Sequence, residues 1–290
     1  MALGCTGQNR SPLAKSPDAA GTTRSLGTVD VAFPILHGPF GEDGTVQGLL
    51  ELTGLPYVGS GVLASALGMD KHFAKIVLQA AGLAVAPWVR VTPAGWRVDN
   101  ALWRARALAL GLPVFVKPAR AGSSVGVSKV AEWSELDAAL DFAFAEDSAA
   151  LIETAIVGRE IEVGVISGRN GAPPRVSLAG EIIVTGRAFY DYAAKYLDDS
   201  AASLVCPTEL SDAEMAELRG LAARAFEAIG ASGLARVDFF FSGNQFIVNE
   251  LNTMPGFTPI SMFPKCWEAS GMSYADLIGE LIQLGLETVR

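Results

Sequence analysis

The sequence lacks several features that would indicate particular classes of protein. Its three cysteines, Cys5, Cys206 and Cys266, are odd in number, widely spaced and without a C-x-x-C pair, so neither a disulfide framework nor a zinc site is expected. No apolar run reaches the roughly 18 residues of a membrane span. A Walker A loop is absent too. We therefore expect a cytoplasmic protein with free thiols and no membrane partner.

An excess of positive charge is also missing. Lys and Arg number 22 against 31 Asp and Glu, which gives a net charge of -9. Because nucleic-acid-binding proteins usually carry a basic surface, no nucleic-acid partner is expected. A small anion held by a few local Lys and Arg residues remains compatible with this balance. The 290 residues, half of them hydrophobic, are enough for about two domains or one large one with a sizeable core.

The pattern of strands and helices changes along the chain. Residues 1–28 are rich in Ser, Thr, Gly and Pro and predict a disordered tail. Strands are then predicted at 29–38, 56–61, 87–92, 113–118, 125–130 and 150–156. Helices are predicted at 45–54, 61–81 with a break near Met69, 99–111 capped by Asp99 or Asn100, and 134–146 capped by Ser134. This part is typical of α/β proteins.

The second half predicts an α+β arrangement. Its elements are strands at 159–168 and 175–184, a helix at 211–230 capped by Ser211, two strands within 234–252 joined by a hairpin turn at 242–244, and a final helix at 273–289. Two such parts favour a nucleotide-type site in a cleft between lobes.

The segment VFVKPARAGSSVGVSK, residues 114–129, places a lysine and a Gly-Ser-Ser loop between two strands. Lys117 ends an apolar strand, so its ammonium is expected to project from the strand end. The N–H groups of such a loop can surround phosphates, with Ser123 as an additional donor. A plain hairpin is the alternative, and this segment alone favours it.

A second group of polar residues lies on two very apolar strands. Arg236 and Asp238 are two apart on one strand, and Glu250 and Asn252 are two apart on the next, so each pair shares a face. A hairpin would bring the pairs together. Two carboxylates and an amide are ligands that Mg²⁺ uses together with phosphates. A solvated outer face is the alternative, but two facing pairs beside an arginine favour the metal site.

Two further segments leave their alternatives open. FYDYAAKYL, residues 189–197, is either a packed amphipathic turn or a lid that closes over an active site. His37 follows a predicted strand and precedes a glycine-rich loop, where a lone histidine is more often structural than a ligand.

Taken together, the segments resemble the D-alanine–D-alanine ligase family, whose members have the ATP-grasp fold. The resemblance runs from about Val29 to the C-terminus and is carried by residues 36–71, VKPARAGSSVGVSK, FYDYAAKY, ARVDFFF and NELNTMPGFTPISMFP. It implies that ATP phosphorylates the carboxylate of one D-alanine, and that the amine of a second D-alanine displaces the phosphate. The product is a precursor of peptidoglycan, needed for cell-wall synthesis and cell shape. A homodimer is also implied.

The resemblance implies a role for each matching residue. The phosphates of ATP would be held by Lys71, Lys117 and Lys195, its adenine by Glu153 and its ribose by Glu160. Two Mg²⁺ or Mn²⁺ ions would be held by Asp238, Glu250 and Asn252. The two substrates would be contacted by His37 and Ser261. Arg236 and the backbone N–H of Gly256 would stabilise the tetrahedral oxyanion. Ser123 and Tyr196 would link the Gly-Ser-Ser loop at 122–124, here called the serine loop, to the lid near the attacking amine.

One part of the family pattern is missing. The family begins with a glycine-rich loop, G-G-x-S-x-E-x-x-V-S, whose glutamate orients the first D-alanine, and this sequence has no such loop. We therefore expect a disordered tail at 1–28, a truncated N-terminal α/β domain at 29–67, a central lid-like ATP-grasp domain at 68–152 and a C-terminal catalytic domain at 153–290. The missing loop keeps a non-catalytic nucleotide-binding paralogue open. A ligase for D-lactate or D-serine is a further alternative, although the lid with Tyr196 resembles the dipeptide-forming type.

Overall fold

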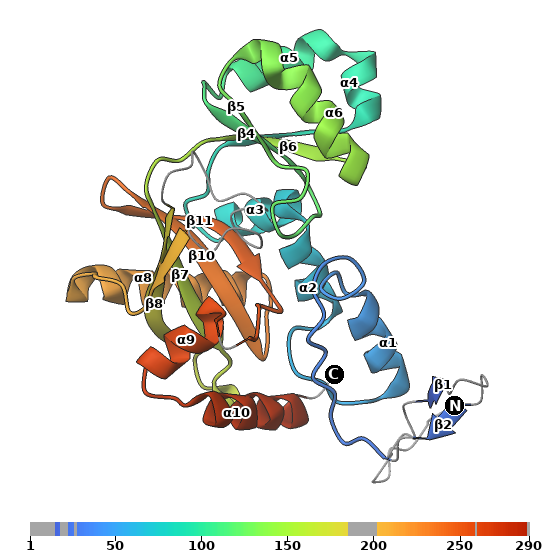
Figure 1. Ribbon diagram of the computed structural model, residues 1–290, viewed down its shortest axis with the longest axis vertical. Helices are drawn as coiled ribbons and strands as arrows, with labels where there is room; N and C mark the ends of the chain where they lie inside the picture. Colours follow the sequence, from blue (N-terminus) through green and yellow to red (C-terminus); the bar gives the residue numbers. More distant parts are fainter. Residues whose placement is uncertain (1–14, 18–22, 26–27, 185–201, 259, 289–290) are drawn as a thin grey trace.

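The computed structural model describes residues 15–17, 23–25, 28–184, 202–258 and 260–288. Figure 1 shows two larger sheets along the long axis of the molecule, each with its own helices, and helices α1 and α2 to one side, near the small β1–β2 pair. Within the described residues, no helix is both long and apolar enough to cross a membrane.

The N-terminal part consists mainly of three helices: α1 (Thr45–Thr53), α2 (Val62–Met69) and α3 (Lys71–Ala80). The predicted break near Met69 is confirmed. It arises because the Asp70 side chain accepts hydrogen bonds from the backbone N–H groups of His72 and Phe73 and so caps the new helix α3.

The strands predicted at 29–38 and 56–61 are not formed. Only an isolated parallel bridge joins Ala32 to Tyr57. Pro34 has no N–H, and the next two N–H groups donate locally, from Ile35 to the Phe33 carbonyl and from Leu36 to the Pro34 carbonyl, both at 2.9 Å. The backbone therefore turns on itself and does not extend a ladder.

Two short strands lie where the sequence predicts a disordered tail. They are β1 (Lys15–Pro17) and β2 (Thr23–Ser25), which pair antiparallel with each other. Three residues in each strand form a minimal ladder, too short to give the alternating pattern on which a strand prediction depends.

The central part is a four-stranded antiparallel sheet in the order β3-β6-β4-β5. Its elements are β3 (Trp88–Val91), α4 (Pro93–Val98), α5 (Asn100–Leu108), β4 (Val114–Pro118), β5 (Ser128–Val130), α6 (Leu136–Glu146) and β6 (Ala150–Thr154). Asp99 caps α5 as predicted. The predicted cap Ser134 is wrong, because a 3₁₀ turn, Trp133–Glu135, precedes α6 and leaves Glu135 at the cap position.

The C-terminal part is a five-stranded antiparallel sheet in the order β11-β10-β7-β8-β9. Its strands are β7 (Arg159–Ile166), β8 (Arg175–Val184), β9 (Ala202–Val205), β10 (Leu234–Ser242) and β11 (Gln245–Asn252). Helix α8 (Asp212–Ala228) packs into one hydrophobic cluster with this sheet, whereas α9 (Met262–Ala269) and α10 (Tyr274–Glu287) pack into another. Ser211 caps α8 as predicted. The sheet therefore shares two hydrophobic clusters with its helices, and the polar site residues lie on its strands.

Candidate active site

The predicted pairing of the two polar strands is confirmed. In the β10–β11 ladder, Asp238 lies opposite Glu250 and Arg236 lies opposite Asn252. Residues directly opposite each other in an antiparallel ladder point to the same face. Arg236 donates to both carboxylate oxygens of Asp238 at 2.7 Å, and Asn252 Nδ2 donates to Asp238 Oδ2 at 2.9 Å. The four side chains thus share one face.

A residue that the sequence reasoning missed completes this cluster. Glu162 on β7 lies opposite Asp238, on the other side of β10 from β11, and its Oε2 is 3.2 Å from Arg236 Nε. Burial acts to lower the pKa of Arg236, but the charges of Asp238 and Glu162 outweigh it and raise that pKa well above its ordinary value. The strict alternation of REIEV, which puts Glu160 and Glu162 on one face, could have identified this position.

A second charged cluster lies between the central sheet and α3. Lys117 at the end of β4 donates to Glu153 Oε1 at 2.7 Å, and the ammonium of Lys75 lies 2.7 Å from Glu153 Oε2. Glu153 and Lys75 are 3% and 1% exposed. Burial raises the pKa of Glu153, but the two lysine charges reverse the effect and leave it lowered. Burial lowers the pKa of Lys75, and Glu153 offsets this only in part.

Lys75 was also missed by the sequence reasoning. It lies on the buried face of α3 with Ala74 and Leu78, a face on which an unpaired lysine is costly. A lysine at a core-facing helical position was the available indication.

Lys71 links the cluster around Asp238 to the loop that holds Ser123 and Ser124. Its ammonium donates to the Ala121 carbonyl at 2.7 Å and lies 3.7 Å from Glu250 Oε2. Ala121 leads into the serine loop, where Ser123 and Ser124 have left-handed backbone angles, φ 53° and 58°. Non-glycine residues with this conformation are uncommon and concentrate at functional sites. The arrangement places the serine loop, a lysine and a carboxylate together.

The predicted substrate residues also lie together. A Cβ atom added to Gly256 would lie 2.9 Å from Ser261 Oγ, so only glycine fits there without a shift. His37 Nδ1 lies 3.1 Å from the Met254 carbonyl, in the same segment after β11. A hydrogen bond with Glu42 raises the pKa of His37, although burial opposes it. His37 therefore lies beside the segment after β11 that holds Gly256 and Ser261, although it is more than 200 residues away in the sequence.

Of the remaining predicted site residues, only Glu160 lies within the described ranges. Glu160 lies on β7 opposite Phe240 and Ile182. Lys195 and Tyr196, together with the predicted lid at 189–197, lie outside the described residues.

The chemistry of the donor set fits a magnesium ion. Asp238, Glu250 and Asn252 supply two carboxylates and an amide on one face of the β10–β11 hairpin. In the described ranges there is no group of three His, Cys, Asp or Glu residues that could hold a metal ion. In the proposed magnesium site the third oxygen ligand is the amide of Asn252, and asparagine is not one of those four residue types.

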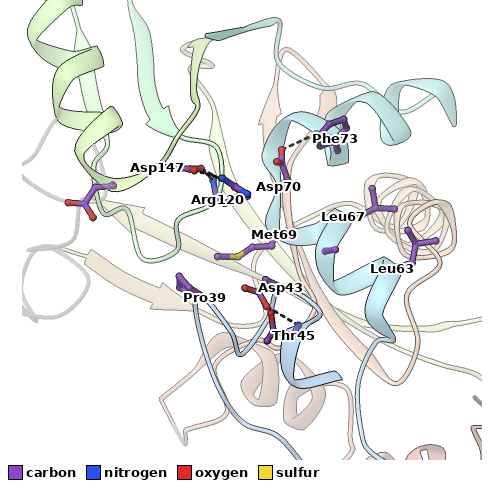
Figure 2. A pocket seen from close by; sticks show the side chains of 12 residues that line it. Pro39, Asp43, Thr45, Leu63, Leu67, Met69, Asp70, Phe73, Arg120 and Asp147 are labelled. Atoms are coloured by element: carbon purple, nitrogen blue, oxygen red, sulfur yellow. Dashed lines mark hydrogen bonds and ion pairs between the residues drawn. The ribbon is translucent and has the colours of Figure 1, made fainter. Parts of the chain in front are cut away.

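A cavity of about 530 Å³ lies between the N-terminal helices and the central part (Figure 2). Asp43 and Thr45 border it from the N-terminal part, Met69 from α2, and Arg120 and Asp147 from the central part, where Arg120 Nη2 donates to Asp147 Oδ1 at 2.6 Å. Neither charged cluster lines this cavity, so it is not the predicted nucleotide site.

Comparisons with known proteins match nearly the whole chain. Residues 6–60 match the family described as D-ala D-ala ligase N-terminus, and residues 77–283 match D-ala D-ala ligase C-terminus. The D-alanine--D-alanine ligase of Paenarthrobacter aurescens is 58% identical over 266 residues, which are 91% of this chain and 70% of that protein. The enzyme of the same name from Kocuria rhizophila is 54% identical over 260 residues, covering 89% and 68%.

Solved structures agree with these matches. The VanG D-Ala:D-Ser ligase from Enterococcus faecalis has a TM-score of 0.80 and 36% identity, covering 90% of this chain and 74% of that one. The D-alanine-D-alanine ligase from Coxiella burnetii has a TM-score of 0.76 and 38% identity, covering 91% and 72%. The fold is that of an ATP-grasp ligase. Within that class, the chain belongs to the D-alanine–D-alanine ligase family.

Proposed function

We propose that this protein joins two D-alanines to D-alanyl-D-alanine with ATP, for the synthesis of peptidoglycan precursors. Relatives of that name at 58% identity favour this product over D-alanyl-D-serine, since the D-serine ligase neighbour is 36% identical. The observation that carries the proposal is the β10–β11 register, which puts Arg236, Asp238, Glu250 and Asn252 on one face.

The first step is transfer of the terminal phosphoryl group of ATP to the carboxylate of one D-alanine. Phosphoryl transfer depends on positioning and on neutralising charge. Lys71, Lys117 and Lys195 take the phosphates, while Glu153 contacts adenine and Glu160 contacts ribose. The contact between Lys71 and Ala121 supports this assignment, because it holds the serine loop against the lysine.

The metal assignment rests on donor chemistry. Asp238, Glu250 and Asn252 are the residues that would hold two Mg²⁺ or Mn²⁺ ions. When bound, such ions neutralise phosphate charge and orient the transferred group. In the structure described above, Arg236 and Lys71 lie beside the same carboxylates and offset their charge.

The second step is attack by the amine of the second D-alanine on the carbonyl carbon of the acyl phosphate. The C–N bond forms, the C–O bond to phosphate breaks, and phosphate leaves with the proton that the amine gives up. Negative charge develops on the former carbonyl oxygen, where Arg236 and the Gly256 N–H stabilise it. Ser261 binds the carboxylate of the attacking D-alanine, His37 lies near the first one, and Ser123 and Tyr196 join the serine loop to the lid. The close approach of Gly256 to Ser261 supports a shared substrate site.

The wider organisation follows from the same proposal. The parts at 29–67, 68–152 and 153–290 act as the N-terminal, central and catalytic domains, with ATP between the last two. The cytoplasm is the proposed compartment, because both ATP and D-alanine are available there. A homodimer is proposed from the family resemblance alone.

The test is D-alanine-dependent phosphate release by the purified full chain with ATP and Mg²⁺. We expect release to rise on adding D-alanine, and D-alanyl-D-alanine to appear by mass spectrometry. Parallel reactions with D-serine or D-lactate as the second substrate are expected to give less mixed product. If ATP binds but D-alanine does not raise phosphate release, the protein is a non-catalytic nucleotide-binding relative and the proposal fails.

A further inference from the structure

Two cysteine side chains that are sixty residues apart in the sequence meet in the C-terminal part. Cys206 directly follows β9, the edge strand of the five-stranded sheet, and Cys266 lies within α9. Their sulfur atoms are 3.7 Å apart. Cys206 is partly exposed and Cys266 is fully buried. Both are free thiols in this structure, and the mechanism proposed above uses neither.

The two thiols differ in reactivity. The contact with Cys266 lowers the pKa of Cys206, and the charge of Lys265 acts in the same direction, although burial opposes both. The pKa of Cys266 is raised by its contact with Cys206 and by burial. A thiolate with a lowered pKa and access to solvent is the form that oxidants attack, and a neighbouring thiol can then resolve the oxidised sulfur.

We propose that Cys206 and Cys266 form a peroxide-sensitive site that closes to a reversible disulfide and slows the enzyme. The Cys206 thiolate attacks one peroxide oxygen, the O–O bond breaks, and Cys206 becomes a sulfenic acid. The Cys266 sulfur then attacks the Cys206 sulfur, the S–O bond breaks, and the oxygen leaves as water with the Cys266 proton. Two thiols lose two electrons in total, and hydrogen peroxide is reduced to two waters. A dithiol reverses the reaction by exchange.

Closing the disulfide requires movement near the active site. The sulfur atoms must approach from 3.7 Å to a bond length of about 2.05 Å. Cys266 Sγ lies 3.8 Å from the backbone carbonyl of Glu162, whose side chain pairs with Arg236. Helix α9, which carries Cys266, begins directly after Ser261. Oxidation therefore displaces the segments that position the oxyanion and the second substrate, and shifts of about 1 Å at such groups can lower turnover by about 100-fold.

The experiment uses the full chain with Cys5→Ser, because Cys5 lies outside the described residues and would add a third thiol. The protein is treated with hydrogen peroxide, and free thiols, intact mass and D-alanine-dependent phosphate release are measured before and after dithiothreitol. We expect the loss of both thiols, a mass decrease of two hydrogens, a Cys206–Cys266 crosslinked peptide, and turnover that falls about 10- to 100-fold and recovers on reduction.

Two matched variants locate the chemistry. With Cys266→Ser, peroxide is expected to leave a sulfenic acid on Cys206 that dimedone traps, and with Cys206→Ser neither crosslink nor adduct forms. Retention of both thiols under peroxide, or a crosslink that leaves turnover unchanged, would overturn the proposal. The effect on turnover rests on the proposed ligase function. If untreated protein lacks that activity, the thiol and mass measurements still test the disulfide independently.

Discussion

The two charged clusters of the molecule are built in opposite ways. Between the central sheet and α3, one carboxylate, Glu153, lies between the ammonium groups of Lys75 and Lys117. In the C-terminal sheet, one guanidinium, Arg236, lies between the carboxylates of Glu162 and Asp238. Taken by itself, the first trio has one positive charge in excess and the second has one negative charge in excess.

The difference indicates what each cluster can bind. A buried charge without a partner is costly, so an excess charge favours a ligand of opposite sign. The lysine-rich trio suits the phosphates of a nucleotide, and the carboxylate-rich trio suits divalent cations. Lys71 lies between the Ala121 carbonyl and Glu250, so a proposed phosphate ligand stands beside a proposed metal ligand. This complementarity is what the proposed binding of ATP with metal ions requires.

The largest effect is expected from breaking the carboxylate-rich cluster at its centre. Arg236→Ala removes the proposed oxyanion donor and takes the guanidinium away from Glu162 and Asp238, so kcat is expected to fall about 10²- to 10³-fold. Steady-state kinetics would measure the loss, and calorimetry would measure ATP affinity, which is expected to change much less.

Arg236→Lys is the matched control for that substitution. It keeps the charge but not the two parallel donors that contact Asp238, so an intermediate kcat is expected. Equal losses of turnover and ATP affinity in Arg236→Ala would argue against an oxyanion role.

An intermediate effect is expected from the lysine-rich cluster. Lys75→Met takes the partner from one buried oxygen of Glu153 while Lys117 remains, and the free energy of unfolding is expected to fall by about 1–3 kcal/mol. Urea denaturation measures this change in the free energy of unfolding. Lys129→Met, on the neighbouring strand β5 and exposed, is the control and is expected to change stability by less than about 0.5 kcal/mol. Similar values for both variants would show that the buried pair contributes nothing specific.

The smallest effect concerns pH. Because the pKa of Glu153 is lowered in the folded protein, its stabilising contribution is complete above the unfolded value of about 4.3 and is lost as pH falls through the folded pKa. Lys75→Met weakens one cause of the lowering, so the stabilities of wild type and variant are expected to converge in acid. Urea midpoints between neutral and acidic pH measure this, and parallel curves would contradict it.

Much of the C-terminal part could be predicted from local patterns. The period of two in ARVDFFF and FIVNELN, with a short turn between them, specified the hairpin and hence the facing pairs Arg236–Asn252 and Asp238–Glu250. The strand predictions at 29–38 and 56–61 were wrong because a strand also needs a partner strand. The N–H groups after Pro34 donate to local carbonyls and are not available for a ladder.

The sequence by itself determined the family, the facing pairs of the β10–β11 hairpin and two helix caps, Asp99 and Ser211, because these depend on neighbours within a few residues and on recognisable motifs. The tertiary structure decided which distant charges share a cluster. Lys75 meets Glu153, Glu162 meets Arg236, and Cys206 meets Cys266 only because separate elements pack together. Contacts across 60 to 80 residues depend on the packing of whole sheets and helices, which no local pattern encodes.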